Sequence, residues 1–438
     1  MLNAKTLVAR NAAALLSALS RVPESPLKTL LFALAPSSNV TRNELSALTA
    51  LLTKRFPTHV GCISAPVLID SKLHPEHCSV SLALVDGIPF RSTVPGRPEP
   101  QVGRWHAGRN RDVSEDGTQM NNASGAKLGS TGSDVFNSAL GENGEMDWQK
   151  LWSLPSSSNC KVGDALPQDL QCLESSSIGS FIYFSDRALE GITTELQNTF
   201  PSSHQLALFA SPTPFLTGRP VTLFYNGQVH SDGAVGIALP SSLPSQLDLN
   251  FPTLVPLTPA LPITSSEGNL ILSINSSNPT RLLLSAIQKH GLSLSGDSNR
   301  VGKEDAFYIG VIEGGKLSQL YHINSGDPSR GTMALNTDMA PREGALVQMF
   351  RLPHPPTGVM VNPSSSHSHK PSVSLVVIPE VDSPPPSPPG PHSVHDTVFL
   401  NTFIAASENG FMLSRGNSTT SVPWTCTVPG GKVTLTWN

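Results

Sequence analysis

The sequence predicts an α+β fold with two domains, in which mixed, mainly antiparallel sheets are flanked by outer helices and interrupted by long disordered insertions. Short apolar runs separated by turn residues recur along the chain, whose 438 residues include 39 prolines and 34 glycines. This composition favours many short strands joined by turns. Amphipathic helical stretches occur among the strands without a regular strand–helix repeat, which argues against a doubly wound parallel sheet. A chain of this length is also too long for a single core.

Residues 1–26 have two interpretations. They include Lys5, Arg10 and Arg21 and contain no acidic residue before Glu24, a composition typical of mitochondrial presequences. Their leucines also form the apolar stripe of a helix that would precede the first strand. The segment is thus read either as an N-terminal helix or as a targeting segment. Five cysteines without a CxxC pair otherwise favour an intracellular protein, cytoplasmic or nuclear.

Residues 27–239 are expected to form the first domain. Its elements recur as strand, helix and strand, with Thr41 placed to cap the first helix. The expected strands are Thr29–Ala35, Val60–Ser64, Ser79–Val85, Ile178–Ser185, Gln205–Ala210 and Ala234–Leu239, and the expected helices are Asn43–Phe56 and Asp186–Gln197. The stretch at about 95–177 is rich in Gly, Ser, Asn and Pro and lacks sustained periodicity, which predicts a disordered insertion.

The segment Val221–Leu239 carries the clearest turn signals of the chain. Asn226-Gly227 separates two strand candidates, and this dipeptide is the strongest short signal for a hairpin. A second turn follows at Ser231-Asp232-Gly233, where His230 and Asp232 place a base near a carboxylate. Because a catalytic triad is an arrangement in space, this spacing does not define one. A turn stabilised by its own aspartate side chain is the favoured interpretation.

Residues 240–262 contain several prolines and predict an extended linker to a second domain, 263–438. A helix is expected from Pro279 onward. The expected strands are Leu270–Ile274, Ala306–Gly315, Leu317–Asn324, Thr332–Leu335, Ala345–Arg351, Val373–Ile378, Val398–Ala405, Val422–Val428 and Lys432–Trp437. A Pro/Ser-rich insertion at about 353–394 is expected to be exposed and partly polyproline-like.

Composition and motifs exclude several classes of function. The net charge of −4 gives no electrostatic case for nucleic-acid binding. No apolar run approaches the ~20 residues of a membrane span. The chain contains no GxGxxG, Walker A, GxSxG or HExxH motif. Four histidines in or beside the Pro/Ser-rich stretch are expected to be solvated, namely His367, His369, His392 and His395. We therefore expect neither a metal nor a cofactor.

Polar turns at strand ends are the best candidates for a binding site. Glu267-Gly268-Asn269 and Ser407-Glu408-Asn409 each place a carboxylate beside an amide, a pairing that suits a small ligand. Because the Asp232-Gly233 turn also lies between confident strands, we expect the three turns to face one another. The alternative is ordinary turn chemistry, for which Asn, Asp and Gly are the usual residues. The expected ligand-binding residues are Asp232, Gly233, Glu267, Gly268, Asn269, Ser407, Glu408 and Asn409.

Three segments together resemble the FIST family. Ile263–Leu284 resembles the opening of that family's C-terminal half, where a T-x-x-EGN-x-I turn and strand precede a small helix. Asp232–Gly236 resembles the close of its N-terminal half, and Phe403–Phe411 resembles its late strand and turn. The resemblance covers roughly Leu27–Arg91 and Ser180–Asn438. It implies two FIST halves joined at the linker, without an invariant catalytic signature.

Three functions are compatible with this sequence. The FIST resemblance implies a non-catalytic sensory module for a small metabolite such as an amino acid. A related animal F-box protein with FIST halves implies a substrate-recruiting adaptor for ubiquitin ligation, although the first strand begins near Thr29 and leaves no room for an F-box before it. The third function is a hydrolase that uses His230 and Asp232 or the acidic turns. The first is the expectation, with a protein partner left open.

Overall fold

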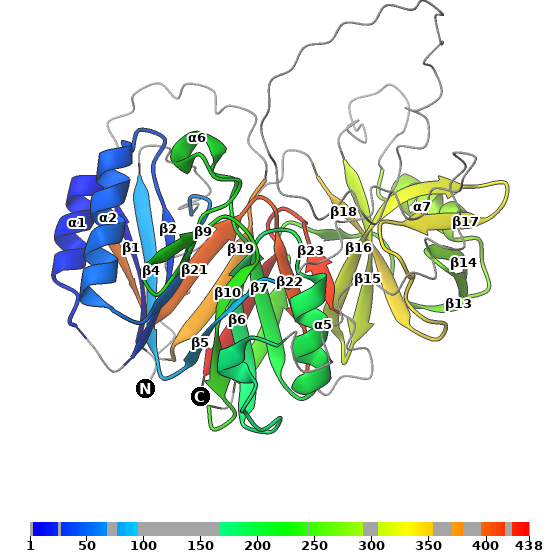
Figure 1. Cartoon of the computed structure of the whole chain (residues 1–438). Coiled ribbons are helices and arrows are strands. Elements are labelled where there is room, and N and C mark those ends of the chain that lie inside the picture. Colours follow the sequence, from blue (N-terminus) through cyan, green and yellow to red (C-terminus); the bar gives the residue numbers. More distant parts are fainter. Residues whose placement is uncertain are drawn as a thin grey trace, which may run out of the picture. The chain divides into compact units, whose positions relative to one another are not determined.

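The computed structural model describes residues 3–24, 28–67, 77–94, 166–243, 245–291, 305–353, 370–379, 396–416 and 423–437. All of them belong to one compact unit, which joins the chain on either side of residues 100–165. Strands make up 48% and helices 17% of the described residues. The predicted α+β class is therefore wrong, because the fold is dominated by strands (Figure 1).

A seven-stranded sheet, with the order β20-β1-β4-β2-β3-β8-β9, contains the N-terminal strand. Its strands are β1 (Asn3–Ala9), β2 (Thr29–Ala35), β3 (His59–Ile63), β4 (Cys78–Val85), β8 (Leu223–Tyr225), β9 (Gln228–His230) and β20 (Thr397–Leu400). Strands β2 and β3 are parallel and the other neighbours are antiparallel. Helices α1 (Ala12–Ser20) and α2 (Arg42–Arg55) cover one face, where Leu15 and Leu48 pack with Phe32 (Figure 1).

Helix α2 shows how the local sequence sets an element's start. The Thr41 hydroxyl accepts a hydrogen bond from the Glu44 amide (3.3 Å), and the Glu44 carboxylate accepts one from the Thr41 amide (2.9 Å). This capping box satisfies two amides that the helix leaves without an internal partner. The predicted cap at Thr41 is confirmed.

A six-stranded sheet has the order β23-β22-β7-β6-β10-β5. Its strands are β5 (Ile88–Ser92), β6 (Ile178–Ser185), β7 (His204–Phe209), β10 (Ala234–Pro240), β22 (Phe411–Ser414) and β23 (Trp424–Cys426). Strands β6 and β7 are parallel, and their other neighbours are antiparallel to them. Helix α5 (Glu190–Thr199) packs on this sheet, where Ile192 and Leu196 share a core with Phe181.

A four-stranded sheet, in the order β11-β24-β19-β21, contributes to the central core. Its strands are β11 (Ser245–Asn250), β19 (Ser372–Val377), β21 (Thr402–Ser407) and β24 (Lys432–Trp437). Strands β19 and β21 are parallel. Leu375 from this sheet packs in one buried cluster with Val60 of β3 and Ile182 of β6. The three sheets therefore share a core.

A fourth sheet closes on itself. Its order is β12-β18-β13-β14-β17-β16-β15, and β15 also pairs with β18. Its strands are β12 (Val255–Pro256), β13 (Leu261–Glu267), β14 (Leu270–Ile274), β15 (Ala306–Glu313), β16 (Lys316–Asp327), β17 (Thr332–Leu335) and β18 (Leu346–Leu352). Helix α7 (Pro279–Lys289) packs against it through Leu283 and Ile287, which share a separate core with Ile271.

The sheets combine strands from both sides of the expected linker. Strand β20 pairs with β1, β22 pairs with β7, and β11, which lies inside residues 240–262, pairs with β24. Within residues 1–26, helix α1 is present, but it follows strand β1. Both segments contain strands that the sequence analysis did not predict, and these strands raise the strand content above the expected mixture.

Large parts of the two predicted insertions lie outside the described residues. The structure does not describe residues 95–165 of the first insertion or residues 354–369 and 380–394 of the second. The four histidines of the Pro/Ser-rich stretch also lie outside the described residues. Strand β19 falls within the second insertion at the position expected for an apolar run. Within the described ranges, no helix has the length and apolar character needed to cross a membrane.

Candidate functional site

The carboxyl ends of three parallel strand pairs meet in one region. The Ser64 amide after β3 donates to Leu34 of β2, and the Ser211 amide after β7 donates to Ile63 of β3. Three further backbone hydrogen bonds connect the other ends: Ala65 to Ala406 (2.9 Å), Ala210 to Ser185 (2.8 Å) and Ile378 to Ser407 (3.1 Å). Ligands of α/β proteins bind beyond the carboxyl ends of parallel strands. This junction is therefore the candidate site.

The turn after β21 supplies some of the polar side chains of the candidate site. Ser407 is fully buried, and its hydroxyl accepts a hydrogen bond from the Asn409 amide (3.0 Å). The Ser211 hydroxyl donates to Glu408 Oε2 (2.8 Å), and Arg187 Nη2 donates to Asn409 Oδ1 (2.8 Å). Asn409 Nδ2 also donates to the carbonyl of Ala210, the residue after β7 (3.2 Å). Glu408 and Asn409 are thereby held in fixed orientations.

The segment after β6 connects this turn to the Asp232-Gly233 turn. Asp186 Oδ2 accepts a hydrogen bond from the Gly233 amide (2.8 Å), and the Asp186 amide donates to the Gly233 carbonyl (3.1 Å). The Ser185 hydroxyl donates to the same carbonyl (3.0 Å). Arg187, which follows Asp186 directly, reaches Asn409. We call Ser185, Asp186, Arg187, Ser211, Gly233, Ser407, Glu408 and Asn409 the strand-end cluster.

Gly233 is required by the backbone at this turn. Its φ is +75°, and a Cβ there would lie 2.3 Å from the Ser92 carbonyl oxygen. The next strand, β10, pairs with both β6 and β5, so the turn has strands on each side. Only glycine satisfies both the positive φ and the close approach.

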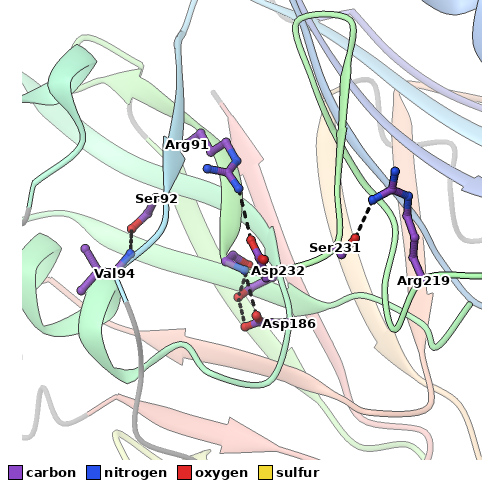
Figure 2. Close-up of polar contacts among 9 residues, drawn as sticks. Arg91, Ser92, Val94, Asp186, Arg219, Ser231 and Asp232 are labelled. Carbon is purple, nitrogen blue, oxygen red and sulfur yellow. Dashed lines mark hydrogen bonds and ion pairs between the residues drawn. The ribbon is translucent and has the colours of Figure 1, made fainter. Parts of the chain in front are cut away.

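Asp232 precedes Gly233 in the turn, but its carboxylate is not part of the cluster. Its side chain is 75% exposed and pairs with Arg91 at 3.2 Å. In Figure 2, Arg91 approaches the turn from one side, while Asp186 lies on the other. Asp232 therefore neighbours the site without lining it.

The Glu267-Gly268-Asn269 turn lies in a different place. It joins β13 to β14 in the fourth sheet, where Asn269 Nδ2 donates to the Leu335 carbonyl (3.2 Å) and the Gly268 carbonyl accepts from the Ala340 amide (2.7 Å). Among the described residues, no hydrogen bond or ion pair joins this turn to the strand-end cluster. The structure thus brings together two of the three predicted turns.

His230, Ser231 and Asp232 do not form a hydrogen-bonded series. The Ser231 hydroxyl accepts from Arg219 Nη1 (2.6 Å), and Asp232 pairs with Arg91 (Figure 2). Burial lowers the pKa of His230, and Arg91 adds to this effect. The turn is not stabilised by its own aspartate as the sequence suggested, because the Asp232 carboxylate pairs with Arg91 and the Gly233 amide donates to Asp186 instead.

Four residues of the strand-end cluster were not predicted as site residues from the sequence: Ser185, Asp186, Arg187 and Ser211. The helix expected from Asp186 begins only at Glu190, so Asp186 and Arg187 belong to a strand-end loop. A signal was present in the sequence, because several parallel strands end close to a proline. These prolines are Pro36, Pro66, Pro212 and Pro379.

Comparisons of the chain with protein-family models, curated proteins and solved structures found no match. In the described part of the chain, no three side chains of His, Cys, Asp or Glu are grouped so that they could hold a metal ion.

The strand-end cluster offers complementary charges at a half-buried edge. Arg187 is exposed and carries a guanidinium, whereas Glu408 is only partly exposed and carries a carboxylate. Ser211 and Ser407 are buried beneath them. A guanidinium recognises a carboxylate and a glutamate recognises an ammonium, so the cluster can bind a small ligand that carries both charges.

Proposed function

We propose that the chain is a non-catalytic sensory module of the FIST type, which binds a small metabolite such as an amino acid at the strand-end cluster. The observation that carries the proposal is the pairing of Arg187 with Asn409 and of Ser211 with Glu408, at the junction of three parallel strand pairs. Fixed groups lose little freedom on binding and so support recognition of a small ligand.

The proposed ligand contacts follow from the charges. The Glu408 carboxylate would accept hydrogen bonds from an α-ammonium group, while the Arg187 guanidinium would bind the α-carboxylate. Asn409 would orient Arg187, since its Oδ1 already accepts from Nη2. Side chains of the ligand would determine which metabolite binds.

The two predicted glutamates provide a matched test. Thermal-shift and calorimetric titrations with the common amino acids should identify a ligand that stabilises the wild-type chain. Glu408→Gln should weaken its binding at least about tenfold, because one charge-assisted contact is lost. Glu267→Gln should bind like the wild type, since Glu267 lies in the β13–β14 hairpin.

Two results would contradict the proposal. The first is a folded wild-type protein that shows no shift with any amino acid. The second is equal loss of binding in both glutamine variants, which would place the ligand away from the strand-end cluster.

A further inference from the structure

Two arginines and a histidine surround the turn between β9 and β10. Arg91 Nη2 contacts Asp232 Oδ1 (3.2 Å), and Arg219 Nη1 donates to the Ser231 hydroxyl (2.6 Å) (Figure 2). His230 ends β9, and its titration responds to Arg91, Arg219 and Asp232 together. Two carboxylates lie at the same turn: Asp232 pairs with Arg91, and Asp186 Oδ2 accepts a hydrogen bond from the Gly233 amide (2.8 Å).

Two side-chain nitrogens in this group lack a hydrogen bond. Arg91 Nε and His230 Nε2 are both buried atoms without a hydrogen bond. A buried polar atom is usually satisfied, and leaving one unpaired is costly. Two such atoms around one turn therefore point to a ligand that supplies acceptors.

We propose that Arg91, Arg219 and His230 form a binding site for a small molecule that carries a phosphate group. The three donors come from β5, from the segment after α6 (Pro214–Thr217) and from β9. A tetrahedral phosphate presents acceptor oxygens in several directions and so suits donors that arrive from separate elements, whereas a planar carboxylate suits a single guanidinium.

Phosphate would compete with Asp232, which pairs with Arg91 in the structure. The Asp232 side chain is 75% exposed, so the ion pair is largely hydrated and contributes little to stability. An arriving phosphate can take over the Arg91 contact while the Asp232 carboxylate turns to water. The site uses none of the residues assigned to the proposed amino acid ligand and stands independently of that function.

Phosphate binding should be coupled to proton uptake. Burial and the neighbouring arginines lower the pKa of His230, whereas Asp232 raises it. A bound dianion beside the ring favours the charged imidazolium. Calorimetric titrations of the full chain near neutral pH, in buffers of different ionisation enthalpy, should therefore show more protons taken up per bound phosphate by the wild type than by His230→Gln, since the ionisation of phosphate itself contributes equally to both.

The site is tested by titrating the full chain with inorganic phosphate at constant ionic strength, with chloride and acetate as the comparison anions. We expect saturable binding of phosphate alone. Arg219→Gln should weaken it about tenfold by removing a charge-assisted contact. Asp232→Asn should strengthen it several-fold, because Arg91 is released. Arg330→Gln is the matched control, since Arg330 is 83% exposed and pairs with Asp327 elsewhere.

An effect of phosphate no larger than that of chloride would overturn the inference. Equal binding of acetate would overturn the choice of phosphate, and unchanged affinity in folded Arg219→Gln and His230→Gln proteins would place the anion elsewhere. Arg219 lies on an exposed loop, so its variant is expected to fold. The opposite direction of the Asp232→Asn effect separates a binding site from general destabilisation.

Discussion

His59 is buried and makes hydrogen bonds that require a neutral ring. Its Nδ1 lies 2.7 Å from the Phe56 carbonyl and donates to it, because Nε2 accepts from the Gly227 amide at 2.9 Å. Protonation would place a second hydrogen on Nε2 and remove that acceptor. The ring thus fastens the β8–β9 hairpin to β3.

The free energy of unfolding should decrease as the pH is lowered, because of this histidine. Burial lowers the pKa of His59 below its usual value. A group with a lowered folded pKa contributes stability above its unfolded pKa of about 6.5, and this stability is lost as pH falls through the folded value. Urea unfolding between pH 8 and 5 should show this decline, and His59→Gln should reduce its slope.

The pH slope has to be compared between proteins because other histidines contribute. Burial also lowers the pKa of His204, which would add to the decline in both proteins. Identical slopes in the wild type and the His59→Gln protein would show that His59 does not titrate in this range.

At the scale of an element, the turn at Gly233 should be more sensitive than other glycine turns. Gly233→Ala adds a Cβ 2.3 Å from the Ser92 carbonyl at a φ of +75°, whereas Gly268→Ala meets no atom within 4 Å at a φ of +55°. We expect a loss of about 2–4 kcal/mol in the free energy of unfolding for the first and about 1 kcal/mol for the second. Denaturant titration measures the free energy of unfolding of both variants. Similar losses would contradict the claim that the turn at Gly233 is the more sensitive one.

Elements with strong local signals were predicted from the sequence. Strands β2, β6 and β17 have their expected bounds, because each is a compact run bounded by turn residues. Strand β1 was interpreted as helical, since a short apolar run fits either period. Strand β11 was interpreted as linker because prolines follow it, although Leu247 and Leu249 alternate with polar residues as a strand requires.

The candidate site was predicted only in part, for a physical reason. The turns at Gly233 and Asn409 carry Asp, Asn and Gly, which local rules recognise. Arg187 and Ser211 join them only through pairing of strands that are distant in the sequence, and no local pattern encodes that pairing. The same absence of long-range information placed Glu267 beside the wrong partners.

At the scale of the whole molecule, the two sides of the expected linker depend on each other. Strand β7 needs β22 as a neighbour, and the central core contains Ile182 from one side and Leu375 from the other. The closed fourth sheet has its own core around Ile271 and Ile287. The shared central core and the separate core of the fourth sheet predict that fragments containing one or the other will differ in their ability to fold.

A fragment of residues 1–243 should fail to fold, because it exposes the central core and two strand edges. A fragment of residues 252–353 should unfold cooperatively, because its sheet closes through the β15–β18 pair. Circular dichroism and thermal unfolding of each fragment would test this. A cooperative transition in the first fragment, or none in the second, would contradict the prediction.

The position of β1 has a consequence for the order of events during synthesis. Thr6 pairs with Phe399, and its hydroxyl donates to the Thr402 carbonyl at 2.9 Å. One side of β1 therefore waits for β20, which is synthesised much later. Because contacts of such separation form slowly, the nascent chain carries an open strand edge at least until β20 has been made. Ribosomes that stall before residue 397 would release chains with that edge unpaired, which makes them substrates for chaperones or for aggregation.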